Sequence, residues 1–399
     1  MREGIDRRAM GTLSGAHLAT DFASGSVPAL LPFFTGKFGL SYTLTALLML
    51  SVLVSSSLVQ PLFGLWSDRR GALWLLPGGL ALAAGGLGLS TVAPSYLLVL
   101  VLVFLCGIGI AAFHPEGAKF AVFASGSKRA SGMSLFNIGG NTGYALGPIV
   151  VTPLVLWLGL GWGGLVAAVP VLAVAFALLR ALPYLSTLRP DAAGRGAVAP
   201  GRDDVRAMAL LAAVIGLRSV AWFGLLTFVP LWVVSLGDSE AAGNRLLSLM
   251  LLSGAAGTLL LGPLADRIGL RRTLLGAQAL LAPMILVFVL VGGIPGALAL
   301  MIVGMCVVGT FGVTMVLSQM YLPRHVGMAS GLSIGLAMGL GGIAAVGLGA
   351  VADAVDLRTA LVGSAFAPAL GVVLCLFLPA PAPESRLAPE SQATYPLLD

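Results

Sequence analysis

The sequence has little charge for its length. Only 10% of its 399 residues are Asp, Glu, Lys or Arg, whereas an ordinary soluble domain has about 25%. With 58% hydrophobic residues, the chain has too few polar side chains to cover a water-soluble globule. The composition therefore excludes a soluble domain and indicates an integral membrane protein.

Cysteine and nucleotide-binding motifs are also scarce. Cys106, Cys306 and Cys375 lie in apolar runs without C-x-x-C or zinc spacing, so neither a disulfide framework nor a metal site is predicted. No G-x-x-x-x-G-K-[ST] occurs, so nucleotide hydrolysis at a P-loop is not predicted. GLSIG at 331–335 and GIGIAA at 107–112 imitate enzyme motifs, but each lies in an apolar span with no strand before it. We therefore predict no cofactor and no enzyme.

What the sequence has in abundance is long apolar runs. A helix crosses a bilayer with about 20 apolar residues, and we count twelve such spans, roughly at 10–35, 42–66, 73–93, 96–124, 131–157, 161–182, 206–235, 246–265, 272–292, 295–320, 327–350 and 358–379. The stretch 183–205 is rich in Pro, Gly, Arg and Asp and separates two groups of six. The sequence predicts an all-α membrane protein with a six-helix bundle at 1–182, a cytoplasmic linker at 183–205, a second bundle at 206–379 and a Pro-rich disordered cytoplasmic tail at 380–399.

Lysine and arginine are distributed unevenly between the two sides of this predicted bundle. If the amino terminus is inside, only three of the 22 Lys and Arg residues fall on outside loops, Lys37, Arg245 and Arg358, and one, Arg218, lies inside a span. Because basic residues accumulate on the cytoplasmic side, this predicts cytoplasmic termini in the cytoplasmic (inner) membrane. The net charge of +6 is then an orientation signal, and no nucleic-acid partner is expected.

The two halves of the chain repeat each other. The Gly, Asp, Arg and Gly of GLWSDRRG at 64–71 recur with the same spacing in GPLADRIGLRR at 262–272, an offset of 198 residues, and ASGMSL at 130–135 matches ASGLSI at 329–334. An even number of predicted spans separates the copies, so both halves enter the membrane in the same direction. Such a parallel repeat is typical of two-domain secondary transporters.

These features resemble the major facilitator superfamily. Its loop signature, G-x-x-x-D-R-x-G-x-[RK]-[RK], is complete in the second copy, with Gly262, Asp266, Arg267, Gly269, Arg271 and Arg272. The first copy keeps Gly64, Asp68, Arg69 and Gly71 but has Leu73 and Trp74 where basic residues are usual. The resemblance covers the whole chain. It implies a monomeric transporter with two six-helix bundles around a central cavity, in which these loop residues control access.

A narrower resemblance rests on four stretches. HLATDFASGSVPALLP at 17–32, AAFHPEGAKFA at 111–121, SLFNIGGNTGYALGP at 134–148 and LPRHVGMASGL at 322–332 are similar to the fosmidomycin resistance protein branch of the superfamily. This resemblance implies export of small drugs, such as the phosphonate fosmidomycin, in exchange for protons. The partners it implies are a small-molecule substrate, protons and the lipid bilayer.

Ionisable residues inside predicted spans are candidates for function, because burying them in a bilayer costs several kcal/mol. Asp21 lies about 11 residues into its span and Arg218 about 12 into its own, which at about 1.5 Å per residue is near the middle of a core about 30 Å thick. They are candidates for a substrate site or an interdomain latch, and a purely structural ion pair is the alternative. His17 precedes Asp21 by one turn and is predicted to tune its proton affinity, unless solvent at the inner boundary satisfies the ring.

His114, Pro115 and Glu116 interrupt an apolar span. His114 and Glu116 are two residues apart and must face different ways, so they cannot chelate one metal together. Pro115 frees a backbone carbonyl and bends the helix. The family resemblance places His114 or Glu116 opposite Asp21 and Arg218, which makes His114 a substrate ligand and Glu116 a proton carrier. The alternative is a Glu116–Lys119 pair near the cytoplasmic end.

Asn137, Asn141 and Tyr144 follow one face of their predicted span. They are candidates for hydrogen bonds to a polar substrate, or for contacts between helices. Gly143-x-x-x-Gly147-Pro148 resembles the antiporter motif of this span and fits a packing face of small residues equally well.

The sequence leaves three alternative functions open. The first is transport of a natural metabolite, such as a sugar or organic anion. The second is an intramembrane enzyme that uses His114, Glu116 and Asp21, and the third is a substrate-sensing receptor. The repeat argues against the last two, because a catalytic site does not need two symmetric halves. A large soluble sensory domain is also missing.

Overall fold

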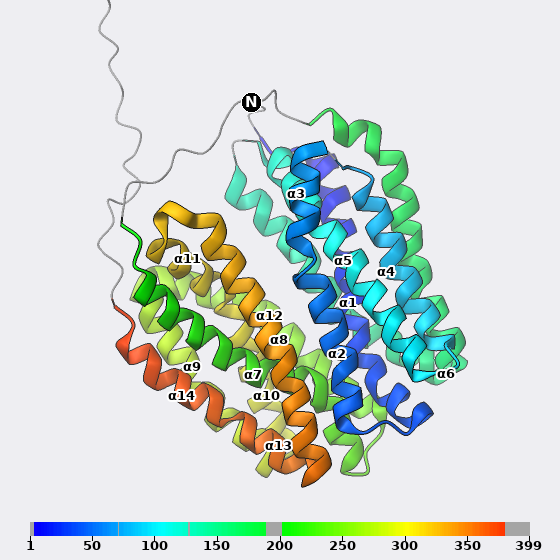
Figure 1. Cartoon of the computed structure of the whole chain (residues 1–399), viewed down its shortest axis with the longest axis vertical. Helices are drawn as coiled ribbons and strands as arrows, with labels where there is room; N and C mark the ends of the chain where they lie inside the picture. The colour runs from blue at the N-terminus through cyan, green and yellow to red at the C-terminus, as the bar shows by residue number, and fades with distance from the viewer. Residues whose placement is uncertain (1–3, 71, 127, 189–201, 380–399) are drawn as a thin grey trace, which may run out of the picture.

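The computed structural model describes residues 4–70, 72–126, 128–188 and 202–379, apart from the side chains of residues 68–70, 129, 130, 326, 327, 330, 331 and 334–336. Within these ranges every regular element is a helix (Figure 1). The predicted tail at 380–399, most of the predicted linker and Gly71 of the first loop motif lie outside them.

The first half of the chain, called the N half below, contains six helices by their bounds: α1 (Arg7–Phe38), α2 (Tyr42–Ser57), α3 (Gln60–Arg70), α4 (Leu75–Val92), α5 (Tyr96–Ser125) and α6 (Arg129–Ser186). The second half, the C half, contains α7 (Val205–Ser235), α8 (Glu240–Ile268), α9 (Leu270–Leu290), α10 (Gly293–Gly309), α11 (Phe311–Tyr321), the 3-10 turn η1 (Pro323–His325), α12 (Val326–Ala354), α13 (Leu357–Ser364) and α14 (Phe366–Phe377).

Each predicted span coincides with a helical segment. Ten segments of the described chain are long and apolar enough to cross a membrane. One of them, Ser131–Ser186, contains both the fifth and the sixth predicted spans. The two spans are separated by a kink of α6 at Gly159, whose φ is +77°. The first span is α1, which is not among the ten and carries His17 and Asp21 in its middle. The second, tenth and twelfth spans are each divided into two helices, a feature that the sequence did not predict.

The sequence repeat has a counterpart in the structure. Asp6 and Asp204, which are 198 residues apart, cap the first helix of each half by accepting hydrogen bonds from Ala9 N and Ala207 N at 3.0 and 2.9 Å. Their own backbone N–H groups donate to Ala124 O and Tyr321 O, at the ends of α5 and α11, at 2.8 and 2.7 Å. The same two contacts therefore close the same end of both halves.

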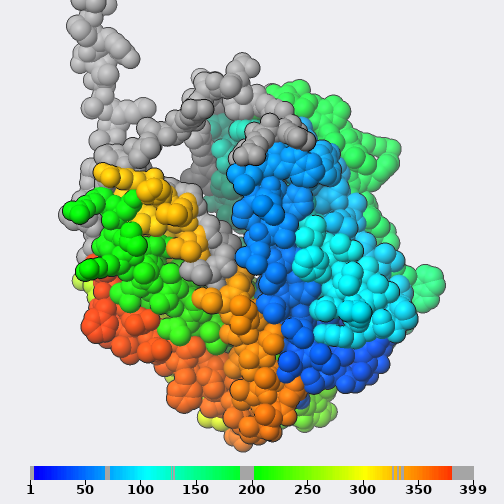
Figure 2. Space-filling view, in the orientation of Figure 1, coloured from blue at the N-terminus to red at the C-terminus, as the bar shows by residue number. Residues whose placement is uncertain are grey.

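The two halves lie side by side and touch at one end of the molecule (Figure 1). We call the end where α1 begins the upper end and the opposite one the lower end. At the lower end α2 packs along α12, as the blue and orange surfaces in Figure 2 show. Thr43 N donates to Asp353 Oδ2 across this boundary at 2.9 Å, and Ser57 Oγ contacts Met338 Sδ at 2.7 Å. At the upper end α3 packs against α2 and α5, and α11 packs against helices of its own half.

Glycines set the close approach of α1 and α6. A methyl group built on Gly143 would overlap the backbone oxygen of Leu18, and one built on Gly147 would overlap the backbone of Gly25. Small residues four apart let two helix backbones meet in this way. The Gly143-x-x-x-Gly147 run is therefore a packing face in this structure, which is one of the two interpretations that the sequence left open.

We expect Gly143→Ala to lower the thermal stability of the purified protein, because the added methyl group meets backbone atoms that cannot rotate away. Overpacking of this kind typically costs about 1–3 kcal/mol. Gly15→Ala in α1 is the matched control, since a methyl group there meets nothing within 4 Å. Thermal unfolding in detergent checks the prediction, and equal midpoints for the two variants would contradict it.

Candidate functional site

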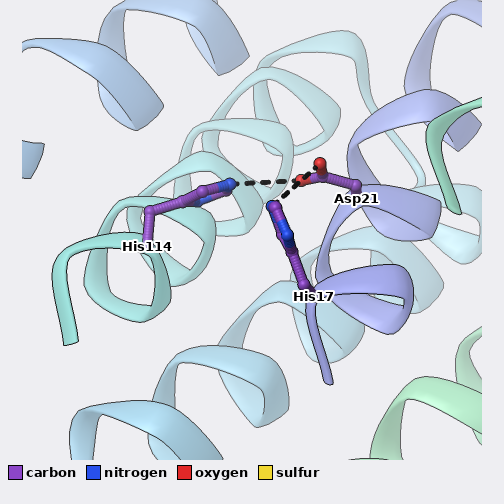
Figure 3. A group of neighbouring side chains, drawn as sticks. All are labelled: His17, Asp21 and His114. Atoms are coloured by element: carbon purple, nitrogen blue, oxygen red, sulfur yellow. Dashed lines mark ion pairs between the residues drawn. The ribbon is translucent and has the colours of Figure 1, made fainter. Parts of the chain in front are cut away.

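Three ionisable side chains meet in the N half (Figure 3). His17 and Asp21 lie one turn apart on α1, and His114 extends from α5. The Nε2 atom of His17 lies 3.3 Å from Asp21 Oδ2, and that of His114 lies 3.2 Å from Asp21 Oδ1. The side chain of His17 is 8% exposed, whereas those of Asp21 and His114 are 18% and 25% exposed. The carboxylate is thus held between two imidazole rings, which we call the His–Asp–His cluster.

Both rings are oriented by backbone carbonyls. His17 Nδ1 lies 2.8 Å from Phe136 O on α6, and His114 Nδ1 lies 2.8 Å from Ile110 O, one turn back on α5. A carbonyl oxygen only accepts, so each Nδ1 carries a hydrogen. The Nε2 atoms of both rings are therefore the atoms left to interact with Asp21.

Helix α6 forms the wall behind the cluster. The ring of Phe136 stacks on His17 with centroids 4.0 Å apart. A methyl group built on Gly140 would lie 2.6 Å from both Asp21 Oδ2 and His17 Nε2, so only glycine leaves room for the pair. Tyr144 is half-buried and within electrostatic reach of Asp21. Asn141 is half-buried and Asn137 is exposed, and both remain candidates for substrate contacts.

The His-Pro-Glu stretch contacts two different helices. His114 meets Asp21 of α1, whereas Pro115 lies 3.7 Å from the Cβ position of Gly64 on α3. Glu116 is fully buried and accepts a hydrogen bond from Ser67 Oγ of α3. Lys119 Nζ lies 3.9 Å from Glu116 Oε2 and 3.1 Å from Ser67 Oγ. The two faces therefore carry different contacts, as the spacing predicts.

The resemblance placed His114 or Glu116 opposite Asp21, and in this structure it is His114 that lies beside Asp21, whereas Glu116 does not. His114 extends to the cluster, whereas Glu116 faces α3 in the first loop motif. The Glu116–Lys119 contact that the sequence left open as an alternative is present. The role of Glu116 as a proton carrier stays a prediction.

Arg218 is buried inside the C half. It is 1% exposed, and its Nη1 donates to Thr310 Oγ1 at 2.7 Å. The guanidinium also lies over the ring of Phe311, 5.0 Å from the centroid. Nε and Nη2 have no hydrogen-bond partner in the described part of the chain. Thr310 is the residue that separates α10 from α11, so Arg218 is bound at the break in that span.

The expected pairing of Asp21 with Arg218 is wrong for this structure. Both carboxylate oxygens of Asp21 are engaged by the histidines of its own half, and Arg218 is turned toward Thr310 and Phe311. Helix spacing predicted equal depth of the two residues in the membrane, but depth alone does not determine the direction in which a side chain points. Each half therefore has its own polar contact between helices: α1 with α5 in the N half, and α7 with Thr310, between α10 and α11, in the C half.

The second loop motif lies at the upper end, between α8 and α9. Gly269 has a φ of +96° and links the two helices, a conformation that glycine adopts at little cost. Arg271 Nη2 donates to Leu376 O of α14 at 2.6 Å, and Asp266, Arg267 and Arg272 are exposed. A methyl group on Gly262 would meet nothing within 4 Å. In the first motif copy, the side chains of Asp68 and Arg69 lie outside the described residues, and the gating role of both motifs stays a prediction.

The His–Asp–His cluster is also compact enough to hold a metal ion, since its ligand atoms lie within 4.8 Å of one another. It is the one group of three or more His, Cys, Asp or Glu in the described ranges with such spacing. The sequence predicted no metal here, and the two ring-to-carboxylate distances of 3.3 and 3.2 Å are those of ion pairs with protonated rings. We therefore interpret the His–Asp–His cluster as a site for protons and not for a metal ion.

Several residues of these sites were missed from the sequence. Five residues that contact the candidate side chains have no unusual feature in the sequence: Gly140, Phe136, Ser67, Thr310 and Phe311. The only available signal was position: Gly140 and Phe136 lie in the quoted SLFNIGGNTGYALGP stretch. Their roles depend on which helix lies opposite, and this information is not local in the sequence.

Comparisons with known proteins agree with this arrangement. The chain matches the family described as Major Facilitator Superfamily over residues 13–346 and 211–399. It is 34% identical over 372 residues to an uncharacterized MFS-type transporter, YfnC, of Bacillus subtilis, covering 90% of each chain. It is 30% identical over 376 residues to the fosmidomycin resistance protein of Escherichia coli, covering 93% of this chain and 92% of that one.

Solved structures show the same fold. A bacterial homolog of the human lysosomal transporter Spinster, in an inward-facing and unoccupied conformation, has a TM-score of 0.76 at 14% identity, covering 95% of this chain and 98% of that one. The nucleoside transporter NupG has a TM-score of 0.74 at 13% identity, covering 93% and 99%. Together with the family match and the multi-pass helical bundle, these findings show that the chain belongs to the major facilitator superfamily and is a membrane transporter for a small-molecule substrate, not an enzyme.

Proposed function

We propose that this transporter exports small polar or anionic drugs, such as fosmidomycin-like phosphonates, in exchange for protons by alternating access. It acts in the inner membrane as a monomer, with both termini in the cytoplasm. The relative named fosmidomycin resistance protein supports the substrate class, and the distribution of Lys and Arg supports the orientation. In this orientation the separated upper end faces the cytoplasm, so the structure corresponds to the inward-facing state of the cycle.

The His–Asp–His cluster is the observation that carries proton exchange. Three protonatable groups share contacts of 3.2 and 3.3 Å in the middle of α1 and α5, where an apolar span has no structural need for them. Asp21 and His114 are partly exposed, which supports exchange of protons between the cluster and solvent. Protons taken up from one side and released on the other would then couple to substrate movement.

The surroundings of Arg218 favour a substrate that carries an anionic group. A guanidinium that is 1% exposed, with two nitrogen atoms lacking partners in the described chain, leaves donor capacity for a ligand. Its planar fork fits a phosphonate or carboxylate with two parallel hydrogen bonds. A natural organic anion would satisfy the same donors, whereas a neutral sugar would leave the positive charge without a partner.

The proposal is tested in everted membrane vesicles that contain the overproduced protein. Uptake of labelled fosmidomycin into these vesicles corresponds to export from the cell. It is expected to depend on an inside-acid pH gradient and to stop when nigericin with K⁺ collapses that gradient. Uptake that persists unchanged after collapse would refute proton exchange, and absence of fosmidomycin uptake with uptake of another organic anion would assign a natural metabolite instead.

We expect Arg218→Ala to weaken binding of an anionic substrate by roughly 10- to 100-fold, since hydrogen bonds to charged groups contribute about 1.5–3 kcal/mol. Arg218→Lys should restore binding only in part, because an ammonium lacks the bidentate fork. Arg245→Ala is the matched control, since Arg245 is exposed in the same half. Binding to purified protein is measured by calorimetry, and equal affinities for wild type and Arg218→Ala would exclude this role.

A further inference from the structure

We infer that His17, Asp21 and His114 act as one unit that holds two shared protons in the conformation observed here, and that loss of these protons breaks the contact of His114 on α5 with Asp21 on α1. The inference rests on the proposed proton exchange for its role in transport, but the proton count rests on geometry alone. It assigns His114, which the sequence placed among the substrate ligands, to the proton site.

The first step is the fixed direction of both rings. Because Phe136 O and Ile110 O can only accept, the 2.8 Å contacts require a hydrogen on Nδ1 of His17 and of His114. A neutral imidazole carries one ring hydrogen, so in the neutral form both Nε2 atoms would present lone pairs. These lone pairs would lie 3.3 and 3.2 Å from Asp21 Oδ2 and Oδ1.

The second step is a count of hydrogens. An ionised carboxylate between two neutral rings has no hydrogen in either contact, so both contacts bring lone pairs together. One added proton turns one contact into a hydrogen bond and leaves the other repulsive. Two protons satisfy both contacts, whether they reside on the two rings or on one ring and the carboxyl group. The arrangement observed therefore fits the two-proton form, whose net charge is +1.

In the described part of the chain, the Asp21 carboxylate has no hydrogen bond or ion pair other than its contacts with the two rings. From α6, Phe136 and Gly140 cover His17, and Tyr144 is the ionisable side chain within reach of Asp21. From α5, Glu116 and Lys119 are directed at α3. From α7, Arg218 is bonded to Thr310. The shared protons are thus the groups that hold the three side chains together.

Loss of protons is expected to weaken the His114–Asp21 contact more than the His17–Asp21 contact. His17 is on the same helix as Asp21, is 8% exposed and is stacked on Phe136, so it stays in place. His114 is 25% exposed and comes from a different helix. When the contacts become repulsive, His114 is the ring that moves, and α5 loses this one of its contacts with α1, next to Pro115. Since Gly64 and Ser67 of α3 pack against this part of α5, the change reaches the start of the first loop motif.

The chain has three histidines, so ¹⁵N NMR of histidine-labelled full-length protein in lipid nanodiscs resolves each ring. His325, exposed at the upper end, is the reference signal. At neutral pH we expect Nδ1–H on both His17 and His114 and a second ring hydrogen on at least one of them. In Asp21→Ala the second hydrogen should be lost from both rings, because no carboxylate holds it.

Two singly protonated rings in the wild type at neutral pH would overturn the inference. If Asp21→Ala does not fold, Asp21→Asn decides, since its amide N–H supplies one of the two hydrogens and one ring should become an acceptor at Nε2. Two doubly protonated rings in Asp21→Asn would also overturn it. Failure of the proposed function is distinguishable: shared protons found by NMR, together with vesicle transport that ignores the pH gradient, would leave the proton unit intact and remove its role in export.

Discussion

Gly140→Ala is expected to reduce proton-driven transport strongly without removing any ionisable group. The added methyl carbon would lie 2.5 Å from His17 Cε1 and 2.6 Å from Asp21 Oδ2, distances that real side chains do not show. His17 cannot retreat, because its ring is stacked on Phe136 and held by the Phe136 carbonyl. The methyl group must therefore displace Asp21 from its partners. An overpacking cost of about 1–3 kcal/mol corresponds to roughly a 5- to 150-fold loss of the paired arrangement.

The measurement separates two activities of the same vesicles. Gradient-driven uptake of labelled substrate should fall by about that factor, whereas substrate exchange at equal pH on both sides should persist, because exchange does not need net proton movement. Gly143→Ala is the comparison variant: it overlaps the α1 backbone at Leu18 and not the cluster, so it should lower stability and reduce both activities together. Normal driven uptake by folded Gly140→Ala would show that the cluster geometry is not needed.

The positions of the spans were predictable because they depend on local composition. Apolar runs of sufficient length predicted where the helical segments lie, and the 198-residue repeat predicted two similar halves. The breaks in the second, tenth and twelfth spans were not predictable. The residues at two of them, Thr310 and Ala365, are compatible with a continuous helix, and what matters is what packs against them. Arg218 bonded to Thr310 shows such a case.

The candidate site was predicted in its members but not in its pairing. Asp21 and His17 followed from helical spacing, and the opposed directions of His114 and Glu116 followed from their separation by two residues. Which neighbour each one meets depends on the rotation of one helix against another. That rotation is set here by contacts such as Gly143 on Leu18, which become visible only in the folded molecule. Equal depth therefore suggested an Asp21–Arg218 pair, whereas the two residues belong to separate polar contacts.

Closure of the lower end depends on a contact that no sequence motif marked. Asp353, at the end of α12, accepts hydrogen bonds from Tyr42 N at 2.7 Å, from Thr43 N at 2.9 Å and from Thr43 Oγ1 at 2.6 Å. Tyr42 and Thr43 begin α2 in the opposite half, so one carboxylate caps a helix across the boundary. Negative charge at a helix amino terminus is favourable, because it faces unpaired N–H groups and the positive end of the helix dipole. The contact must break whenever the protein opens to this side.

We therefore expect Asp353→Ala to shift the protein toward opening at the lower end. Loss of a helix cap costs about 0.5–2 kcal/mol, which corresponds to roughly a 2- to 30-fold change in the open population. Val234 lines a cavity of about 280 Å³ beside Asp353 and is the reporter position. A Val234→Cys protein should react with a membrane-impermeant maleimide faster by that factor when Asp353→Ala is added. The native Cys106, Cys306 and Cys375 are buried and contribute little background.

Asp356→Ala is the control for this experiment, because Asp356 lies at the same end and performs the same chemistry within one half. It caps α13 by accepting from Thr359 N at 2.6 Å, and both residues belong to the C half. Its removal should destabilise α13 locally and leave the labelling rate at Val234→Cys unchanged. An equal rise for both variants would mean that charge at the lower end matters and the contact across the boundary does not. A faster rate for Asp353→Ala alone would identify this single carboxylate as the residue that keeps the lower end closed while the His–Asp–His cluster holds its protons.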